Sequence, residues 1–513
     1  MDIDVVFIVP NNSNKIYQDL SVSYSAIETP TWALLLAEAS RKKGFKVKII
    51  DTSAENLSDN DTYLRIKSLS PRLINFVVYG QNVNAGTTNM SGATRLSKYL
   101  KSKNNDFKIS FTGSHIQALP VETLQKEKSI DIGFTNEGVY ALLNLLNTNL
   151  EIKDFKKIKG IVFRDVDKIL LNDPEIIVPQ EKMDVDLPGY AWDLLPYKNK
   201  PFDLYRSPLW HAEYNENYRT PYAAIQTSLG CMFGCEFCMI NIINRNDNSE
   251  IGVASNYSKM RYWSTEFILK EFKKLFKYGV KTIKITDEMF LLNPKYYIPL
   301  CEKLAEFNKN DELKLWAYSR IDTVKRPEIL EKVRKAGIKW LCLGIESAEK
   351  KIRLEVSKGK FDDVDVSGVI KKIHESDIEV MANYIFGLPT DDLNSMQRTL
   401  DLSLELCTSG WNAYAAMALP GSMLYKQAVE NKLKIPESYE AFSFHSYECS
   451  PLPTKKLKAY EILQFRDKAF HLYHSNNKFL SRVEKKFGYE AKKNIQNKLK
   501  IKLKRKIIEE KSF

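Results

Sequence analysis

Short apolar runs alternate with amphipathic stretches through the first 150 residues of the chain. Runs of four or five apolar residues bounded by turn residues are typical of buried strands, and stretches such as Thr31–Lys43 and Thr94–Lys101 have a helical pattern. This alternation favours βαβ units with a parallel sheet, in which ligands bind beyond the carboxyl ends of the strands. The predicted strands are Val5–Val9, Val47–Ile50, Asn75–Tyr79, Lys108–Thr112 and Ile130–Phe134.

A second alternating series begins at Ala223, and its helical segments include Thr265–Tyr278 and Pro327–Ala336. The stretch between the two series lacks periodicity apart from a predicted hairpin at Lys159–Asn172, so we interpret it as a connector. In a parallel barrel, functional residues lie at the carboxyl ends of the strands. The predicted strands of this series are Ala223–Gln226, Thr282–Ile285, Lys314–Tyr318, Trp340–Gly344, Val380–Phe386 and Ala413–Leu419.

Three cysteines, Cys231, Cys235 and Cys238, follow the first strand of this second series with C-x3-C-x2-C spacing. Thiolates on one short loop can hold three irons of a [4Fe-4S] cube and leave the fourth iron open. A structural zinc site would need a fourth ligand, for which the nearest candidate is His211. A disulfide framework is disfavoured by the odd number, and a ferredoxin would supply a fourth cysteine nearby. The other cysteines are scattered singly and predicted to be core thiols: Cys301, Cys342, Cys407 and Cys449.

The triplet, with Phe237 before its last cysteine and an apolar strand upstream, resembles that of the radical S-adenosylmethionine (SAM) superfamily. In that family the open iron chelates the amino and carboxylate groups of SAM, and one electron cleaves SAM to a 5′-deoxyadenosyl radical. The resemblance implies a partial (β/α)6 barrel. Two further strings carry it, Leu343-Gly344-Ile345-Glu346-Ser347 with Ser357-Lys358-Gly359, and Ala418-Leu419-Pro420-Gly421-Ser422.

The resemblance also implies a SAM site at the carboxyl ends of the barrel strands. SAM carries an ammonium, a carboxylate and a ribose diol, so its site needs hydrogen-bond acceptors, one cation and accessible backbone. Carboxylates at strand ends can accept from the ammonium or ribose, and an arginine can pair with the carboxylate. The alternative for each charged residue is a salt bridge at a strand end. The predicted SAM residues are Phe237, Thr286, Asp287, Glu288, Ser319, Arg320, Glu346 and Gly387.

Turns of the first series are similar to those of the cobalamin-binding domain that precedes the barrel in one branch of this superfamily. The strings are Glu28-Thr29-Pro30-Thr31-Trp32, Ile49-Ile50-Asp51, Thr112-Gly113-Ser114-His115 and Asn136-Glu137-Gly138. The signature D-x-H-x-x-G, whose histidine binds cobalt, does not occur, so His115 is not assigned as a ligand. The alternative is a Rossmann-like domain that has lost its cofactor and serves as a wall. The resemblance implies cobalamin contacts at Gly80, Gln81, Gly113, Ser114, Asn136 and Glu137.

Length and charge complete the domain prediction. A chain of 513 residues exceeds the size of one core, and we predict a Rossmann-like domain at 1–150, a connector at 151–217, the barrel at 218–430 and a helical basic region at 431–513. The net charge is +12, but residues 481–513 hold 12 Lys/Arg against 4 Asp/Glu, so most of the excess is terminal and no nucleic acid is expected. Ile495, Leu499, Leu503 and Ile507 predict one basic amphipathic helix, either packed on its own domain or touching an anionic surface.

The function implied is that of a cobalamin-dependent radical SAM methyltransferase acting on an unactivated carbon of a small metabolite, lipid or glycan precursor. The cofactors would be a [4Fe-4S] cluster, SAM and cobalamin, with an external flavodoxin- or ferredoxin-type electron donor. No apolar run is long enough to span a bilayer and the start lacks a basic n-region, so a cytoplasmic enzyme is expected.

Three alternatives to this function stay open to different degrees. A radical cyclase or rearrangement enzyme of the same architecture is separable only by its product. A methylthiotransferase would need a second cysteine triplet, and no cysteine precedes Cys231. An iron–sulfur interaction protein is the non-enzyme alternative, and the residues at the strand ends argue against it.

Overall fold

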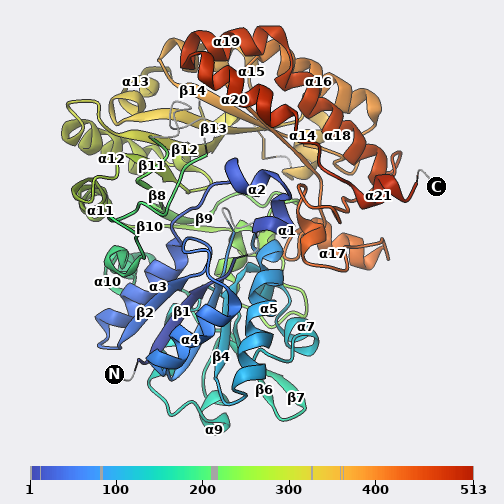
Figure 1. The fold of residues 1–513 in the computed structure, drawn as a ribbon. Helices are drawn as coiled ribbons and strands as arrows, with labels where there is room; N and C mark the ends of the chain where they lie inside the picture. Colours follow the sequence, from blue (N-terminus) through green and yellow to red (C-terminus); the bar gives the residue numbers. More distant parts are fainter. Residues whose placement is uncertain are drawn as a thin grey trace.

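The computed structural model describes residues 3–11, 13–80, 85–208, 218–324, 327–358, 360–361 and 363–511. Figure 1 shows two α/β units, one above the other, with the C-terminal helices lying over the upper unit. The predicted α/β class is therefore confirmed. Gln81 and His211 lie outside the described residues.

The lower unit contains a seven-stranded sheet in the order β2-β1-β3-β4-β5-β6-β7. The first five strands are parallel, whereas β6 and β7 form an antiparallel hairpin at the β5 edge. This hairpin, which we placed in the connector, thus extends the first sheet. The strands are β1 (Val5–Val9), β2 (Val47–Asp51), β3 (Leu73–Val78), β4 (Ile109–Gly113), β5 (Ile132–Phe134), β6 (Ile161–Asp165) and β7 (Lys168–Leu171).

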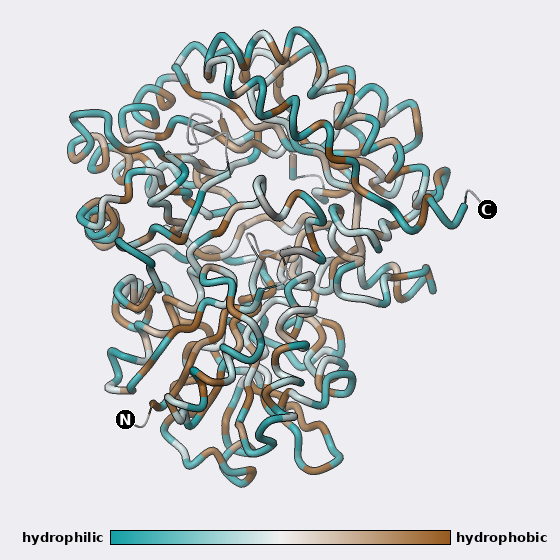
Figure 2. Tube along the Cα trace, viewed as in Figure 1, coloured by the Kyte–Doolittle hydropathy of each residue, from teal (hydrophilic) through white to brown (hydrophobic). Residues whose placement is uncertain are grey.

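Helices cover both faces of this sheet because its strands are apolar on both sides. Val5 and Phe7 of β1 pack in the core that contains α3 and α8, whereas Val6 and Ile8 pack in the core that contains α4, α5 and α7. Figure 2 shows these strands as the most hydrophobic part of the lower unit. The helices of residues 13–186 are α1 (Ser13–Tyr17), α2 (Leu20–Ser23), α3 (Thr31–Lys42), α4 (Asp59–Leu69), α5 (Gly86–Lys103), α6 (Ser114–Ala118), α7 (Pro120–Lys126), α8 (Val139–Leu146), α9 (Ile152–Phe155) and α10 (Met183–Asp186). Of these, α1 and α2 lie above the sheet, next to the upper unit (Figure 1).

The upper unit contains a six-stranded parallel sheet in the order β8-β11-β12-β13-β14-β15, with β8 and β15 as its edges. All six strands were predicted, although the last ends at Ala415 and not at Leu419. The strands are β8 (Tyr222–Ile225), β11 (Thr282–Ile285), β12 (Lys314–Arg320), β13 (Ile338–Glu346), β14 (Glu379–Phe386) and β15 (Gly410–Ala415).

Helices of the upper unit follow the strands in sequence. Ser264 caps α11 and Asp392 caps α16, each accepting a backbone N–H three residues later, which explains where these helices begin. The helices are α11 (Thr265–Lys277), α12 (Pro294–Phe307), α13 (Pro327–Lys335), α14 (Lys350–Val356), α15 (Val366–Glu375), α16 (Leu393–Leu406) and α17 (Met423–Glu430). An antiparallel pair that we did not predict, β9 (Ser228–Cys231) with β10 (Lys259–Tyr262), lies between the two units.

The C-terminal region contains α18 (Ala459–His474), α19 (Asn477–Phe487), α20 (Tyr489–Leu499) and α21 (Lys506–Glu509). The prediction of one amphipathic helix through Ile495 and Ile507 is wrong, because residues 500–505 are not helical. Tertiary hydrogen bonds override the local pattern there. Gln18 exchanges hydrogen bonds with the backbone of Lys504, and the N–H of Lys506 donates to the carbonyl of Tyr447.

A buried ion pair joins the two units. Glu137, three residues after the end of β5, lies 2.6 Å from Arg261 of β10, and both side chains are at most 1% exposed. The other carboxylate oxygen of Glu137 accepts from the N–H of Val178, and Arg261 also donates to the carbonyl of Val178. Glu137 and Arg261 therefore connect the first sheet, the connector and the β9–β10 pair.

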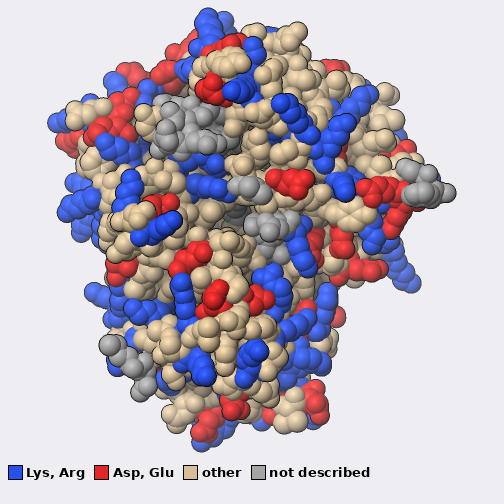
Figure 3. Space-filling model, viewed as in Figure 1, with Lys and Arg blue, Asp and Glu red and all other residues tan. Residues whose placement is uncertain are grey.

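The surface in Figure 3 carries Lys and Arg over both units, with Asp and Glu among them. Ion pairs at the surface of the described residues include Arg398 with Glu349 and Lys335 with Glu331. Among the described residues, none of the helices combines the length and apolarity that crossing a bilayer requires.

The buried pair yields a stability prediction. Arg261→Met should lower the free energy of unfolding by about 3–5 kcal/mol, because it leaves the Glu137 carboxylate buried without its cation. The double variant Glu137→Gln/Arg261→Met should recover part of this loss. Urea unfolding followed by circular dichroism measures both values.

Arg398→Met is the matched control, since it breaks an exposed pair that is worth about 0–1 kcal/mol. If the Arg261→Met protein were as stable as this control, the conclusion that the Glu137–Arg261 pair stabilises the contact between the two units would be contradicted.

Candidate functional site

The cysteine loop begins at the end of β9, where Cys231 is buried, and Cys235 and Cys238 are partly buried. Asn241 of the 3-10 turn at Ile240–Asn244 braces the loop from inside. Its side-chain oxygen accepts from the Cys231 N–H at 2.7 Å, and its side-chain nitrogen donates to the carbonyl of Phe233 at 3.1 Å. The loop is therefore ordered by its own hydrogen bonds.

The chemistry of this loop fits an iron–sulfur cube. Burial raises the pKa of Cys231 to about 12 and that of Cys235 to about 11, so their thiolates need a positively charged partner. The N–H of Phe233 donates to the Cys231 sulfur at 3.4 Å, a contact that stabilises a metal-bound sulfur. Among the described residues, no three His, Cys, Asp or Glu side chains converge on one metal ion. A cube instead places each thiolate on a different iron.

Arg320, at the end of β12, lies against this loop. Its guanidinium makes two hydrogen bonds to Asp322, at 2.6 and 2.7 Å, and its Nη1 lies 3.9 Å from the Cys235 sulfur. The group stacks between Phe233 and Phe361, at 3.8 and 4.4 Å from the ring centroids. The structure therefore places a cation beside the cluster loop. Pairing of Arg320 with the SAM carboxylate stays a prediction.

Glu288 and Glu346 face a common cavity from the ends of β11 and β13. Burial raises the pKa of each carboxyl to about 7. Glu346 has a φ of 65° at an irregularity of the β13–β14 pairing, and its carboxylate lies over Gly344. A Cβ at Gly344 would lie 2.5 Å from the Glu346 oxygen, so a side chain there would displace this carboxylate from its present position. Both acids are thus positioned to accept hydrogen bonds from a ligand in the cavity.

Other predicted SAM residues have structural partners. The carboxylate of Asp287 accepts three hydrogen bonds of 2.6 Å, from Thr227 N–H, Thr227 Oγ1 and Ser228 Oγ, and thereby fixes the turn between β8 and β9. Ser319 bonds the hydroxyl of Thr323, and Thr286 bonds the carbonyl of Ile225. Their contacts with SAM stay predictions.

Gly387 has a packing role that the sequence did not suggest. It follows β14 with a φ of 79°, and Ile462 of α18 would lie 2.6 Å from a Cβ there. The missing side chain therefore lets α18 approach the strand end. This contact gives the glycine a structural reason, and backbone contact with the adenosine stays a prediction.

A cavity of about 740 Å³ extends from Phe237 and Cys238 through the barrel interior to the C-terminal helices. Sequence reasoning missed most of its walls, yet a signal exists in the strands. Wall residues recur at every second position, because alternate side chains of a strand face the same side. They are Trp316 and Tyr318 on β12, Cys342, Gly344 and Glu346 on β13, Met381, Asn383 and Ile385 on β14, and Asn412 and Tyr414 on β15. At the β15 edge the alternation ends, and Gly410, Trp411 and Ala415 line the cavity as well.

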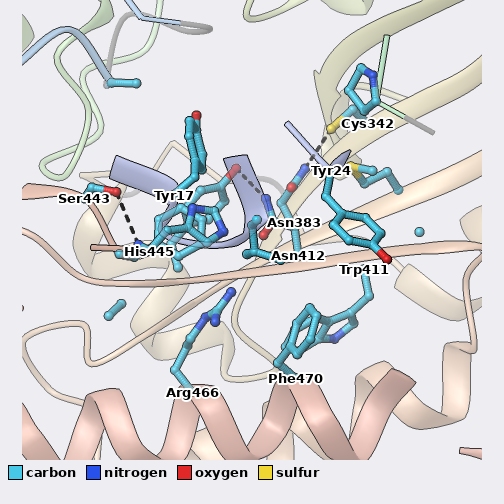
Figure 4. Close-up of a pocket in the computed structure, with 18 of the residues that line it drawn as sticks. Tyr17, Tyr24, Cys342, Asn383, Trp411, Asn412, Ser443, His445, Arg466 and Phe470 are labelled. Carbon is cyan, nitrogen blue, oxygen red and sulfur yellow. Dashed lines mark hydrogen bonds between the residues drawn. The ribbon is translucent and has the colours of Figure 1, made fainter. Parts of the chain in front are cut away.

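Two residues that line the cavity, Cys342 and Lys284, were not predicted to lie at the site. Cys342, predicted to be a core thiol, faces the cavity and accepts from the Asn383 side chain at 3.0 Å. Figure 4 shows this pair above Trp411. Lys284 of β11 also lines the cavity, forms a 2.7 Å ion pair with Glu28, and lies 5.2 Å from the Trp316 ring centroid. Glu28 of the lower unit therefore contacts a strand of the upper sheet at the cavity wall.

The predicted cobalamin residues lie at the carboxyl edge of the first sheet. Gly113 ends β4, and a Cβ there would lie 2.2 Å from the Val78 carbonyl, so the two strand ends approach closely. Gly80 follows β3, and Ser114 begins α6 beside Gly86, where a Cβ would lie 1.9 Å from its hydroxyl. Ala85 and Thr88 of the adjacent segment line the cavity. A group bound at this edge would therefore face the barrel.

Asn136 and Glu137 are occupied by protein contacts at the same edge. The Asn136 side chain donates to the carbonyl of Glu175 and accepts from the N–H of Gly138, and Glu137 pairs with Arg261. His115 bonds Thr87, and burial lowers its pKa to about 3. Cobalamin contacts by Asn136 and Glu137 stay predictions.

Known proteins match both units. The family model of the radical SAM superfamily matches residues 225–403, and that of the B12 binding domain matches residues 18–146. The chain is 24% identical to an uncharacterized methyltransferase of Pyrococcus horikoshii over 460 residues. The aligned region covers 89% of this chain and 90% of that protein. It is 21% identical over 344 residues to the anaerobic magnesium-protoporphyrin IX monomethyl ester cyclase of Synechocystis, 67% of this chain and 61% of that protein.

A solved structure matches the whole fold. It is that of the radical S-adenosylmethionine methyltransferase TsrM from Kitasatospora setae, with cobalamin and a [4Fe-4S] cluster bound. The TM-score is 0.67 at 14% identity, over 98% of this chain and 99% of that chain.

The loop geometry predicts the effect of losing one thiol. Cys235→Ala should reduce bound iron and sulfide and bring SAM cleavage to background, while circular dichroism stays unchanged, because the residue lies in a loop and not in a core. Chemical iron analysis and 5′-deoxyadenosine measurement after anaerobic reconstitution test this. Cys301→Ala is the control, since that thiol is buried in α12; cluster loss in both variants, or in neither, would contradict the assignment.

The raised pKa of Glu346 predicts a pH-dependent stability. Its carboxyl keeps its proton in the folded state up to about pH 7, whereas the unfolded chain releases it near its ordinary value of 4.5. Stability of the cofactor-free protein should therefore fall as pH rises from about 4.5 to about 7. Glu346→Gln should flatten this fall and stabilise the protein more at pH 8 than at pH 5, while weakening SAM binding.

Thermal unfolding at both pH values and equilibrium dialysis with labelled SAM provide the two readouts. Glu375→Gln, on the exposed side of α15, should change neither. Equal stabilisation at both pH values would refute the buried, protonated carboxyl.

Proposed function

We propose that this chain, a member of the radical SAM enzymes that carry an N-terminal cobalamin-binding domain, transfers methyl groups from SAM to an unactivated carbon of its substrate. The family predicted from the cysteine triplet and the turns of the first sheet is confirmed by the two family models and the matching fold. A small metabolite, lipid or glycan precursor is the proposed substrate class.

The observation that carries this proposal is one continuous cavity between the two units. It is lined by Ala85 and Thr88 from the first domain, and by Cys238, Glu288 and Glu346 from the barrel. Carboxyl strand ends of both sheets are where ligands of such folds bind. A group held at the first sheet and SAM held at the cluster loop would therefore share one space.

The residues of the chain have distinct parts in this proposal. Cys231, Cys235 and Cys238 would hold the cluster, and Glu288 and Glu346 would accept from the ammonium and ribose of SAM. When bound, the cluster supplies the electron that cleaves SAM, and cobalamin carries the methyl group. The aromatic walls exclude bulk water from the bound substrate. The aromatic wall residues include Trp316, Tyr318, Trp411 and Tyr414.

The same proposal includes the organisation of the chain. We assign residues 1–150 and 218–430 to the two cofactor domains, 151–217 to the connector, whose β6–β7 hairpin extends the first sheet, and 431–513 to the helical region. The electron comes from an external flavodoxin- or ferredoxin-type donor in a cytoplasmic setting.

The product ratio tests the reaction. Each turnover should consume two SAM molecules and yield one S-adenosylhomocysteine, one 5′-deoxyadenosine and one methylated product, because one SAM gives its methyl group and the other is cleaved. SAM with a trideuterated methyl group should add the whole label to the product, read by mass spectrometry. Glu346→Gln should lower both by-products together.

A product without the labelled methyl group would overturn methyl transfer. Deoxyadenosine released without S-adenosylhomocysteine would instead favour ring formation or rearrangement by the same architecture. Cys301→Ala, which leaves the cluster loop intact, should keep the ratio of the unmodified protein.

A further inference from the structure

The far end of the cavity is built by parts of the chain beyond both family matches. The matched ranges end at residue 403, whereas this end is formed by β15, α18, α20 and residues 501–503. The cationic and imidazole side chains that line it are His445, Arg466, Lys468, His471, His474, Lys498 and Lys502. Among the described residues of this end wall, Asp467 is the acidic one.

Arg466 is the central group of this wall. Its side chain is buried in α18, and Figure 4 shows it reaching from that helix into the cavity. Nε donates to the carbonyl of Ala413 at 2.8 Å, and Nη1 donates to Asp467 at 3.0 Å. These bonds orient the guanidinium, and its Nη2 donates no hydrogen bond to the described residues. A buried guanidinium with a fixed orientation can bind a carboxylate or phosphate through its N–H groups.

The one nearby carboxylate is shared. Asp467 also accepts two hydrogen bonds from Arg505, at 2.8 and 2.9 Å, and Arg505 is itself buried. Lys498 of α20 is a further cation of this wall, and burial together with the charge of Arg466 lowers its pKa to about 8. Positive charge thus exceeds negative charge at this end, which favours an anionic ligand group.

Aromatic rings flank the cations. The Arg466 guanidinium lies 4.9 Å from the Phe444 ring centroid and 5.5 Å from that of Phe470, and Lys498 lies 5.4 Å from the Phe470 centroid. Trp411 and Tyr414 of β15 also line the cavity, and the Trp411 ring lies 6.3 Å from that of Phe470. A ligand that spans the cavity would therefore meet flat apolar surfaces and end at the cations.

We propose that the substrate carries an anionic group, a carboxylate or phosphate, that Arg466 and Lys498 bind at the far end of the cavity, and a flat apolar body along Trp411 and Phe470. This inference rests on the proposed function for its reaction and specifies the class of molecule that is methylated. The anion would anchor one end, which leaves the other end of the substrate toward Cys238 and Glu346.

The test is direct binding to the reconstituted, SAM-loaded protein under anaerobic conditions. Equilibrium dialysis with 2-naphthyl phosphate, 2-naphthoate and 2-naphthol compares three ligands with one flat body and different charges. At least one anion should bind 10-fold or more tightly than the neutral naphthol, and the preferred anion distinguishes phosphate from carboxylate. Equal binding of all three would overturn the proposal.

Variants locate the anion. Arg466→Met should remove the preference, Arg466→Lys should retain part of it, and the exposed Arg398→Met should leave it unchanged. If Arg466→Met does not fold, Lys498→Met provides the same readout, and an undiminished preference in the folded variant would overturn the site. Measuring S-adenosylhomocysteine and 5′-deoxyadenosine in the same preparations separates the two claims. If both by-products form but the protein shows no preference for the anions, only the inference about the substrate is refuted. If the anions bind but no methyl group is transferred, only the proposed function is refuted.

Discussion

The six-stranded sheet of the barrel has two free edges, and the organisation of the molecule follows from the need to cover them. At β8, Thr29 of the first domain donates to the carbonyl of Ala224 and accepts from its N–H, at 3.0 and 2.8 Å. At β15, Arg466 and Tyr473 of α18 donate to the carbonyls of Ala413 and Thr408. Parts of the chain outside the barrel thus bond to both edges, and residues of both parts, such as Glu28 and Arg466, also line the cavity.

This arrangement explains why the cavity holds so many buried charges. A closed, fully packed barrel would fill its interior with apolar side chains, whereas here Lys284, Glu288 and Glu346 face an open interior. The charge of Lys284 is paired with Glu28 from the first domain. Burial raises the pKa of Glu288 and of Glu346 to about 7. The free energy lost by burying these carboxyls is consistent with a site shaped for a cationic ligand such as SAM.

The joint between the domains depends on a second buried charge. Arg261 and Glu137 connect the β9–β10 pair to the first sheet, and the cysteine loop leaves directly from β9. The position of the cluster loop relative to the first domain is therefore set by the same pair that holds the connector. Asn241 then fixes the loop locally through Cys231 and Phe233.

The sequence by itself determined the elements whose signal is local. Strand runs such as Val5–Val9 and Thr282–Ile285 and the spacing of the three cysteines are properties of neighbouring residues, so they could be read before the fold was known. Only the tertiary structure decided which polar groups are already paired and where α20 ends. Asp287 is paired with Ser228, and Gln18 holds the segment after α20 through Lys504. In both cases the two partners lie far apart in the sequence, so no local pattern indicates the contact. Arg466 illustrates the limit: it lies in an ordinary helical pattern, and only the free edge of β15 and the cavity give its charge a position.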